Sequence, residues 1–175
     1  MIIHALAQAF APWQSLYSRS VAVSTSVTAT HILSLLGGGG LAIAADRSTL
    51  RALRRPATVR PMHLDELHDV HRPVLIALGV LLVSGLAMAA ADVEVFAGST
   101  FFWAKMGLVA LLLVNGALLY QTEARLIARR ASADDGESPE DTENRLWGRM
   151  RWTSYASLAL WIITTVAGAI LPNVA

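Results

Sequence analysis

The sequence has 175 residues, of which 54% are hydrophobic and 15% charged, with a formal net charge of +1 and no cysteine. A soluble domain carries roughly 25% charged residues, so this composition is typical of a membrane protein and gives no support to nucleic-acid binding. The lack of cysteine excludes disulfides, thiolate metal sites and cysteine nucleophiles.

The first twenty residues are predicted to form an amphipathic helical segment. Apolar side chains recur at spacings of three and four from Ile2 to Tyr17, which places them on one helix face. No Lys or Arg precedes Arg19, so the basic start of a signal peptide is missing. We expect residues 1–20 to lie in the outer membrane interface, bent at Pro12. Packing against a partner subunit would produce the same pattern.

Four apolar segments follow, each near the ~20 residues that cross a bilayer. Because lipid offers the backbone no hydrogen-bond partners, each segment is predicted to be a helix. The predicted fold class is therefore all-α, a four-transmembrane-helix bundle over residues 21–175 with the interfacial segment before it. Pro73 is expected to start the second helix, and a cap at Ser138 to start the fourth in front of the membrane. The predicted spans are about residues 21–45, 73–91, 101–120 and 153–171.

The basic residues are distributed asymmetrically along the chain. Twelve of the fourteen lie in two stretches between predicted spans, at 47–72 and 125–151. Cytoplasmic loops of membrane proteins carry an excess of Lys and Arg. We therefore expect both stretches in the cytoplasm and both termini on the periplasmic side of a bacterial inner membrane.

His31 is the ionisable residue predicted to lie deepest in the first span, and a run of four glycines, 37–40, follows it. Ionisable residues inside a membrane are costly and mark candidate functional sites. His31 and Gly38 are seven residues apart and share one helix face. An axial histidine with a glycine two turns away leaves room for the edge of a porphyrin. Tight helix–helix packing is the alternative explanation of the glycines.

Lys105 is predicted to lie near the outer end of the third span. It would be within reach of the propionates of a tetrapyrrole held by His31. The alternative is an ion pair with Asp92 or Glu94 in the short outer loop. A second axial ligand at the depth of His31 would have to be a methionine, Met88 or Met106, or be missing.

A second cluster of candidate ligands precedes the second span and contains His63, Asp65, His68 and His71. Histidine and carboxylate ligands suit zinc, copper or iron, so His68 and His71 join His31 as candidate metal ligands. A solvated run at the membrane surface is the alternative. His71 is expected ~20 Å from His31 along the helix axis, too far to share one haem with it.

Two runs carry a resemblance, THILSLLGGGGLAIAADRSTLR and STFFWAKMGLVALLLVNGALLY, joined by a proline-started helix. They resemble a group of uncharacterised four-helix bacterial membrane proteins and, more distantly, are similar to the copper-resistance-D-type membrane domain and the J-type haem-dependent protoporphyrinogen oxidase. The resemblance covers about residues 25–125. It implies that His31 matches the haem-ligand histidine and Lys105 the third-helix lysine. The tryptophan, the L-P-R-L run and the fourth-helix Asn-Glu of the oxidase are missing here.

Two functions remain open from the sequence. The favoured one is an accessory or structural subunit of a larger bacterial membrane complex, in contact with lipid and other membrane subunits, because it requires no ligand. The alternative is a b-type haem protein for electron transfer or for porphyrin or haem handling, built on His31. No catalytic residue is identified.

Overall fold

The computed structural model describes residues 2–56, 60–132 and 140–174, and every element in these ranges is helical. The predicted all-α fold is confirmed. Four helices are long and apolar enough to cross a membrane, over Val21–Ala52, Val70–Ala90, Thr100–Arg129 and Thr142–Leu171. The chain is therefore a multi-pass integral membrane protein. The elements are α1 (Ile2–Arg19), α2 (Val21–Ser34), the π-helical turn η1 (Leu35–Gly39), α3 (Gly40–Ala52), α4 (Arg60–Ala90), α5 (Val93–Gly98), α6 (Thr100–Ser132) and α7 (Glu140–Val174).

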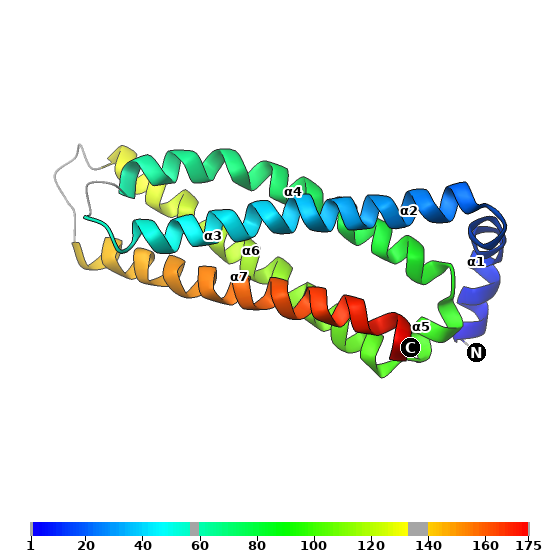
Figure 1. Ribbon diagram of the computed structural model, residues 1–175. Coiled ribbons are helices and arrows are strands. Elements are labelled where there is room, and N and C mark those ends of the chain that lie inside the picture. The colour runs from blue at the N-terminus through cyan, green and yellow to red at the C-terminus, as the bar shows by residue number, and fades with distance from the viewer. Residues whose placement is uncertain (1, 57–59, 133–139, 175) are drawn as a thin grey trace.

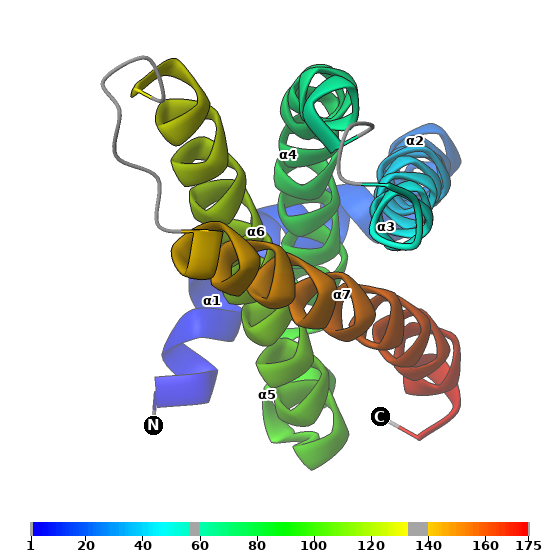
Figure 2. The same cartoon turned by 90° about the vertical axis from the view of Figure 1, so that its left-hand side faces the viewer.

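The helices form two antiparallel pairs. One pair consists of the continuous rod α2–η1–α3 with α4, and the other of α6 with α7 (Figure 1). The rod contacts the second pair through α3, which packs on α7, whereas α2 packs mainly on α4. Seen from the side and from one end, the two pairs diverge toward the end of the bundle that holds both termini (Figures 1 and 2).

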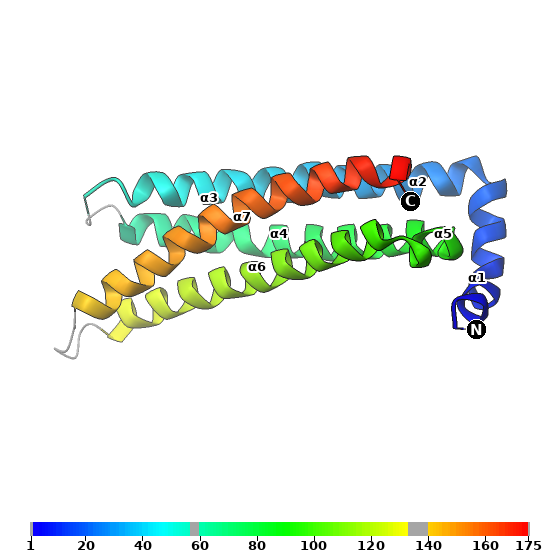
Figure 3. The ribbon, with the colours of Figure 1, turned by 90° about the horizontal axis from the view of Figure 1, so that it is seen from below.

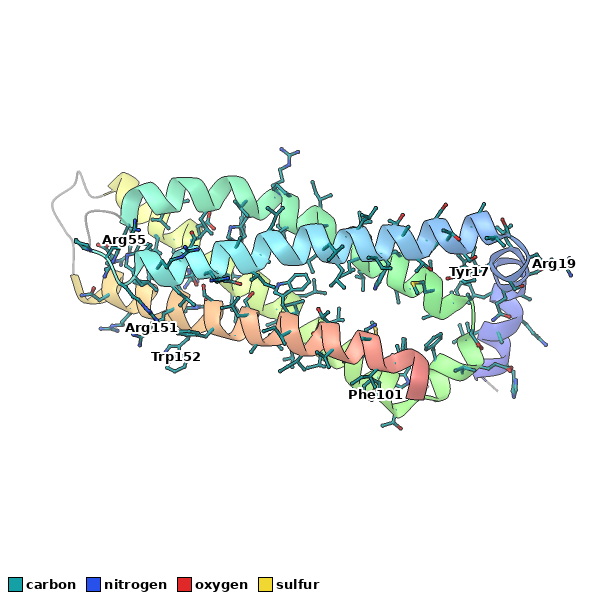
Figure 4. The ribbon with its side chains drawn as sticks, viewed as in Figure 1. Tyr17, Arg19, Arg55, Phe101, Arg151 and Trp152 are labelled. Atoms are coloured by element: carbon teal, nitrogen blue, oxygen red, sulfur yellow. The ribbon has the colours of Figure 1, made fainter. Side chains whose placement is uncertain are left out.

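The two ends of the bundle differ in charge. Arg55 and Arg151 lie at the end opposite the termini, which we call the arginine end (Figure 4). Tyr17 and Arg19 lie at the other end, which we call the α1 end. This segregation is what the arginine distribution in the sequence led us to expect.

Helix α1 lies across the α1 end of the bundle, roughly perpendicular to the long helices (Figure 3). The Trp13 indole N–H donates to the Ala87 carbonyl on α4 at 2.8 Å, and His4 pairs with Glu94 on α5 at 3.1 Å. Pro12 lies inside α1, which ends at Arg19. The predicted membrane-interfacial role of this segment stays a prediction.

The expected start of the second spanning helix was wrong. Helix α4 begins at Arg60 and passes through Pro73, so the histidine-containing stretch before the proline is helical. A proline in a helix interior removes one backbone hydrogen bond. Leu64 and Leu67, which are 4% and 2% exposed, bury apolar area in the bundle and hold this first part of α4 in place. The predicted cap at Ser138 lies outside the described residues.

The apolar interior is divided into two cores. The terminal core lies toward the arginine end, and the central core lies about midway along the bundle. Between and beyond them, polar side chains enter the interior. The terminal core contains Leu64, Leu67, Leu126, Trp147 and Met150, and the central core contains Ala42, Leu78, Leu112 and Trp161.

Candidate functional site

His31 is held on α2 by a hydrogen bond to Ser84 on α4. The distance between His31 Nδ1 and Ser84 Oγ is 3.0 Å. Ser84 has one hydroxyl hydrogen, which it donates to its own helix, to the carbonyls of Val80 at 2.7 Å and Leu81 at 3.1 Å. When the hydroxyl donates to its own helix, Ser84 Oγ accepts from Nδ1–H of His31, and in that tautomer Nε2 carries a lone pair. Metal-binding histidines commonly have their other ring nitrogen fixed in this way.

Gly85 allows the His31 ring to lie directly against α4. A Cβ atom at this position would be 3.1 Å from His31 Cε1 and 3.5 Å from Nδ1. Any larger residue would therefore push the imidazole away from Ser84. The Nδ1–Cε1 edge of the ring faces α4, so the Nε2–Cδ2 edge faces away from that helix.

Lys105, the single lysine of the chain, enters the same part of the bundle from α6. Its Nζ would be 3.4 Å from a Cβ built on Gly168 of α7, so a glycine again provides the space. The side chain is partly buried, and its charge acts on His31 across the space between the helix pairs. We call His31, Ser84, Gly85, Lys105 and Gly168 the His31–Lys105 layer.

The ion pair that was the alternative role of Lys105 does not form. Glu94 pairs instead with His4. Among the side chains that the structure describes, no carboxylate lies within ion-pair distance of Lys105. The layer therefore contains a cation with no anionic side chain beside it.

The glycine run packs against two helices. A Cβ on Gly38 would lie 2.6 Å from the Ala77 Cβ of α4, and one on Gly39 would lie 3.2 Å from the Trp161 ring of α7. Gly37 and Gly40 have nothing within 4 Å of that position. Gly38 thus serves the close packing that was the alternative to a porphyrin contact, and a role for it in cofactor binding stays a prediction.

A second polar layer lies between the two apolar cores. His71 Nδ1 of α4 pairs with Glu123 Oε2 of α6 at 2.5 Å, and the Tyr120 ring lies edge-on to the imidazole at 5.8 Å. Asp46 of α3 is 3% exposed and interacts electrostatically with His71. The hydroxyl-bearing side chains of Ser154 and Ser157 on α7 lie beside Asp46. We call Asp46, His71 and Glu123, with Ser154 and Ser157, the acid–histidine layer.

The metal-ligand prediction for the α4 histidines stays a prediction. His68 is part of α4, but its side chain, like those of His63 and Asp65, lies outside the described residues. Among the residues that the structure describes, no group of three or more His, Cys, Asp or Glu is arranged to hold a metal ion. His71 precedes Ser84, the partner of His31, by thirteen residues, or ~20 Å along α4. The two histidines therefore occupy separate layers, as expected.

A cavity of about 50 Å³ adjoins the acid–histidine layer on the side of the central core. Its polar lining comes from Asp46, His71 and Ser157, and its apolar lining includes Leu78 and Leu112. A volume of this size accommodates one or a few water molecules, which need polar partners of the kind found at one end of it.

Asp46 and Glu123 were not identified as site residues from the sequence, although a signal was present. Asp46 follows Ala42 by four residues and precedes Thr49 by three, and both neighbours are buried. Glu123 likewise shares a buried stripe with Leu119 and Leu126. A carboxylate at the apolar positions of a helical period indicates burial. For Ser84, Gly85 and Gly168 no such signal exists, because their roles depend on which helix lies opposite.

Comparisons with protein-family models, with curated proteins and with solved structures find no match for this chain. The two polar layers are therefore the features that point to a function.

Proposed function

We propose that the His31–Lys105 layer binds a b-type haem, with His31 as an axial ligand and Lys105 beside a propionate. The observation that carries this proposal is Lys105, a partly buried cation whose charge acts on His31 and which has no carboxylate partner among the described residues. An anionic ligand between the helix pairs would supply the missing charge.

Placing the charged Lys105 side chain in the membrane costs free energy. A lysine at the centre of a spanning helix costs about 2.5–3.5 kcal/mol, and less near its end. Lys105 is five residues from the start of α6 at Thr100, ~7 Å along the axis. Its flexible stem can lift the ammonium toward the α1 end when no ligand is present. A propionate placed beside Nζ would form a charge-assisted hydrogen bond in a poorly solvated site, where such bonds are strongest.

The environment of His31 fits an axial ligand. Ser84 fixes the ring orientation and directs the proton to Nδ1, so Nε2 is available to iron without a change of tautomer. Gly85 lets the His31 ring lie against α4, and Gly168 lets the Lys105 side chain lie against α7. The bound group would supply reversible one-electron chemistry. The protein residues would hold it, orient it and exclude water.

The family resemblance supports the same assignment, since it matches His31 and Lys105 to the histidine and lysine of haem-binding membrane bundles. The fourth-helix residues of the protoporphyrinogen oxidase are missing from α7. Electron transfer or haem handling is therefore a better fit than porphyrin oxidation.

Absorption spectroscopy tests the proposal. The chain would be purified from a haem-sufficient host as wild type, as His31→Ala and as His4→Ala, an exposed histidine that serves as the matched control. Wild type and His4→Ala are expected to show a Soret band and a reduced-minus-oxidised difference spectrum, and His31→Ala to lose both. A wild-type protein without a Soret band would refute haem binding.

The role of Lys105 has an independent test because the chain has no other lysine. An amine-reactive reagent can modify only Lys105 and the N-terminal amine. Bound haem is expected to slow the labelling of Lys105 and to leave that of the N-terminus unchanged. Equal labelling of Lys105 with and without haem would exclude the propionate contact.

A second candidate function is supported by α1. Leu6, Phe10 and Leu16 are 44%, 42% and 49% exposed, an apolar face that a neighbouring subunit would cover. We propose on this basis the role of an accessory or structural subunit in a membrane complex. Deletion of residues 1–18 is expected to release the chain from its complex in mild detergent while the bundle stays folded. Migration of the wild-type chain alone on native gels of its own membranes would exclude this role.

The proposed location is the bacterial inner membrane, with the arginine end in the cytoplasm and both termini on the periplasmic side. The segregated arginines support this orientation. Reporter fusions after Ala131 and after Ala175 should report opposite sides. A reporter after Ala131 that is found on the periplasmic side would contradict this orientation.

A further inference from the structure

We propose that the acid–histidine layer is a buried proton-binding site in which Asp46 holds a proton beside a water-sized cavity. This inference stands on the second polar layer alone and does not depend on haem binding.

The partners of the two carboxylates differ. Glu123 of α6 is paired directly with the His71 imidazole. Asp46 of α3 has hydroxyl partners, Ser154 and Ser157 of α7, and senses His71 only through space. An ionised carboxylate buried without a paired cation carries a penalty of several kcal/mol. A protonated Asp46 removes this penalty and can still interact with both hydroxyls, since a carboxylic acid donates as well as accepts.

The other charged groups around Asp46 do not supply a cation in contact with it. The neighbouring arginines on the three helices that carry the site, Arg47, Arg72 and Arg125, are exposed. From α6, Tyr120 presents its ring edge to His71. Arg60 of α4 stacks over Trp147 in the terminal core, its guanidinium carbon 5.5 Å from the ring centroid. Within the described part of α7, the groups that face Asp46 are the two serines.

The cavity gives Asp46 a neighbouring space for water. It brings Asp46, His71 and Ser157 to one water-sized space, so a water there can connect the carboxyl group to the imidazole. The His71 side chain is 12% exposed, compared with 1% for Glu123, and is therefore the more accessible member of that pair. On the opposite side, Leu78, Leu112 and Trp161 of the central core separate the cavity from the His31–Lys105 layer.

The layer lies nearer the arginine end than the α1 end. His71 is one residue from the start of the span Val70–Ala90, and Asp46 is six residues, ~9 Å, from the end of the first span at Ala52. The terminal core lies between the layer and the arginine end, and the central core lies between it and the α1 end. The proton site is therefore enclosed by apolar side chains on both sides.

Infrared spectroscopy of the purified chain tests the proposal. Wild-type protein at mildly acidic pH, where exposed carboxylates are already ionised, is expected to show a carboxylic-acid carbonyl stretch above the amide I region, which shifts in D₂O and disappears as the pH is raised. Asp46→Asn is expected to remove this band, and Asp92→Asn, at an exposed carboxylate of the α1 end, to preserve it. Circular dichroism of each variant verifies that the helices have formed.

If Asp46→Asn does not fold, wild-type protein with ¹³C-labelled aspartate replaces it, and the band is expected to shift with the label. The absence of the band at mildly acidic pH, or a band unchanged by Asp46→Asn or by the label, would overturn the proposal. A divalent metal bound stoichiometrically to wild type after dialysis, and lost in Asp46→Asn, would also overturn it, because the cation of the site would then be a metal.

Discussion

Replacing Gly38 with alanine probes the closest approach between the two helices of the first pair. The added Cβ would lie 2.6 Å from the Ala77 Cβ, whereas ordinary contact begins at 3.4 Å, so the helices must separate by roughly 1 Å. Overpacking of this kind costs about 1–3 kcal/mol. The Gly38→Ala variant is therefore expected to unfold more readily than wild type by an amount in that range.

The same glycine run contains the control. Gly37 has nothing within 4 Å of a built Cβ, so Gly37→Ala adds a methyl group without a clash. In water, alanine is favoured over glycine within a helix by about 0.8–1 kcal/mol. We expect Gly37→Ala to leave stability unchanged or to raise it. Two adjacent Gly→Ala substitutions are thus expected to change stability differently. If any added side chain destabilised this helix, both substitutions would lower stability.

Equilibrium unfolding in mixed micelles, followed by circular dichroism, measures both variants. The double variant Gly38→Ala/Ala77→Gly restores the space and should recover most of the lost stability. Equal stabilities of Gly38→Ala and Gly37→Ala, or no recovery in the double variant, would refute the argument that Ala77 sets the closest approach.

Two further predictions concern single hydrogen bonds. The buried Asn115 amide of α6 donates to the Thr153 carbonyl of α7 at 3.0 Å. Asn115→Ala should therefore lower the unfolding free energy by at least the ~0.6 kcal/mol typical of such bonds in membrane bundles. An unchanged unfolding curve would contradict this expectation. Trp13→Phe removes the bond to the Ala87 carbonyl; limited proteolysis should then cut α1 faster than in wild type, and equal cleavage rates would show that the bond does not hold α1 in place.

The fold was predictable because hydropathy along the chain decides it. Apolar segments of spanning length must be helical in lipid, and the four spans follow from hydropathy alone. The start of α4 at Arg60 was not predictable in this way. Pro73 weakens the helix locally, and the burial of Leu64 and Leu67 that outweighs it depends on α6 and α7 lying opposite.

Only some residues of the candidate site were predictable from the sequence. His31 and Lys105 were recognisable because an ionisable residue in an apolar run is unusual whatever surrounds it. Their proximity results from the packing of the two helix pairs, which the sequence pattern does not specify. Asp46 falls just outside the first predicted span, residues 21–45, and beside Arg47, so it was not predicted to be buried. Its burial depends on Ser154 and Ser157, more than a hundred residues away in the sequence.

The π-helical turn η1 has a consequence for how this protein tolerates insertions and deletions. Such a turn contains one residue more than an α-helical turn, so it rotates the face of α2 relative to that of α3 by about 100°. His31 before the turn faces α4, and Asp46 after it meets the serines of α7. Loss of one glycine from the run would realign the rod as a continuous α-helix and turn His31 away from Ser84, while Asp46 keeps its place. Relatives with a glycine run shortened by one residue are therefore expected to have a different residue at the His31 position, or to carry their histidine one position along.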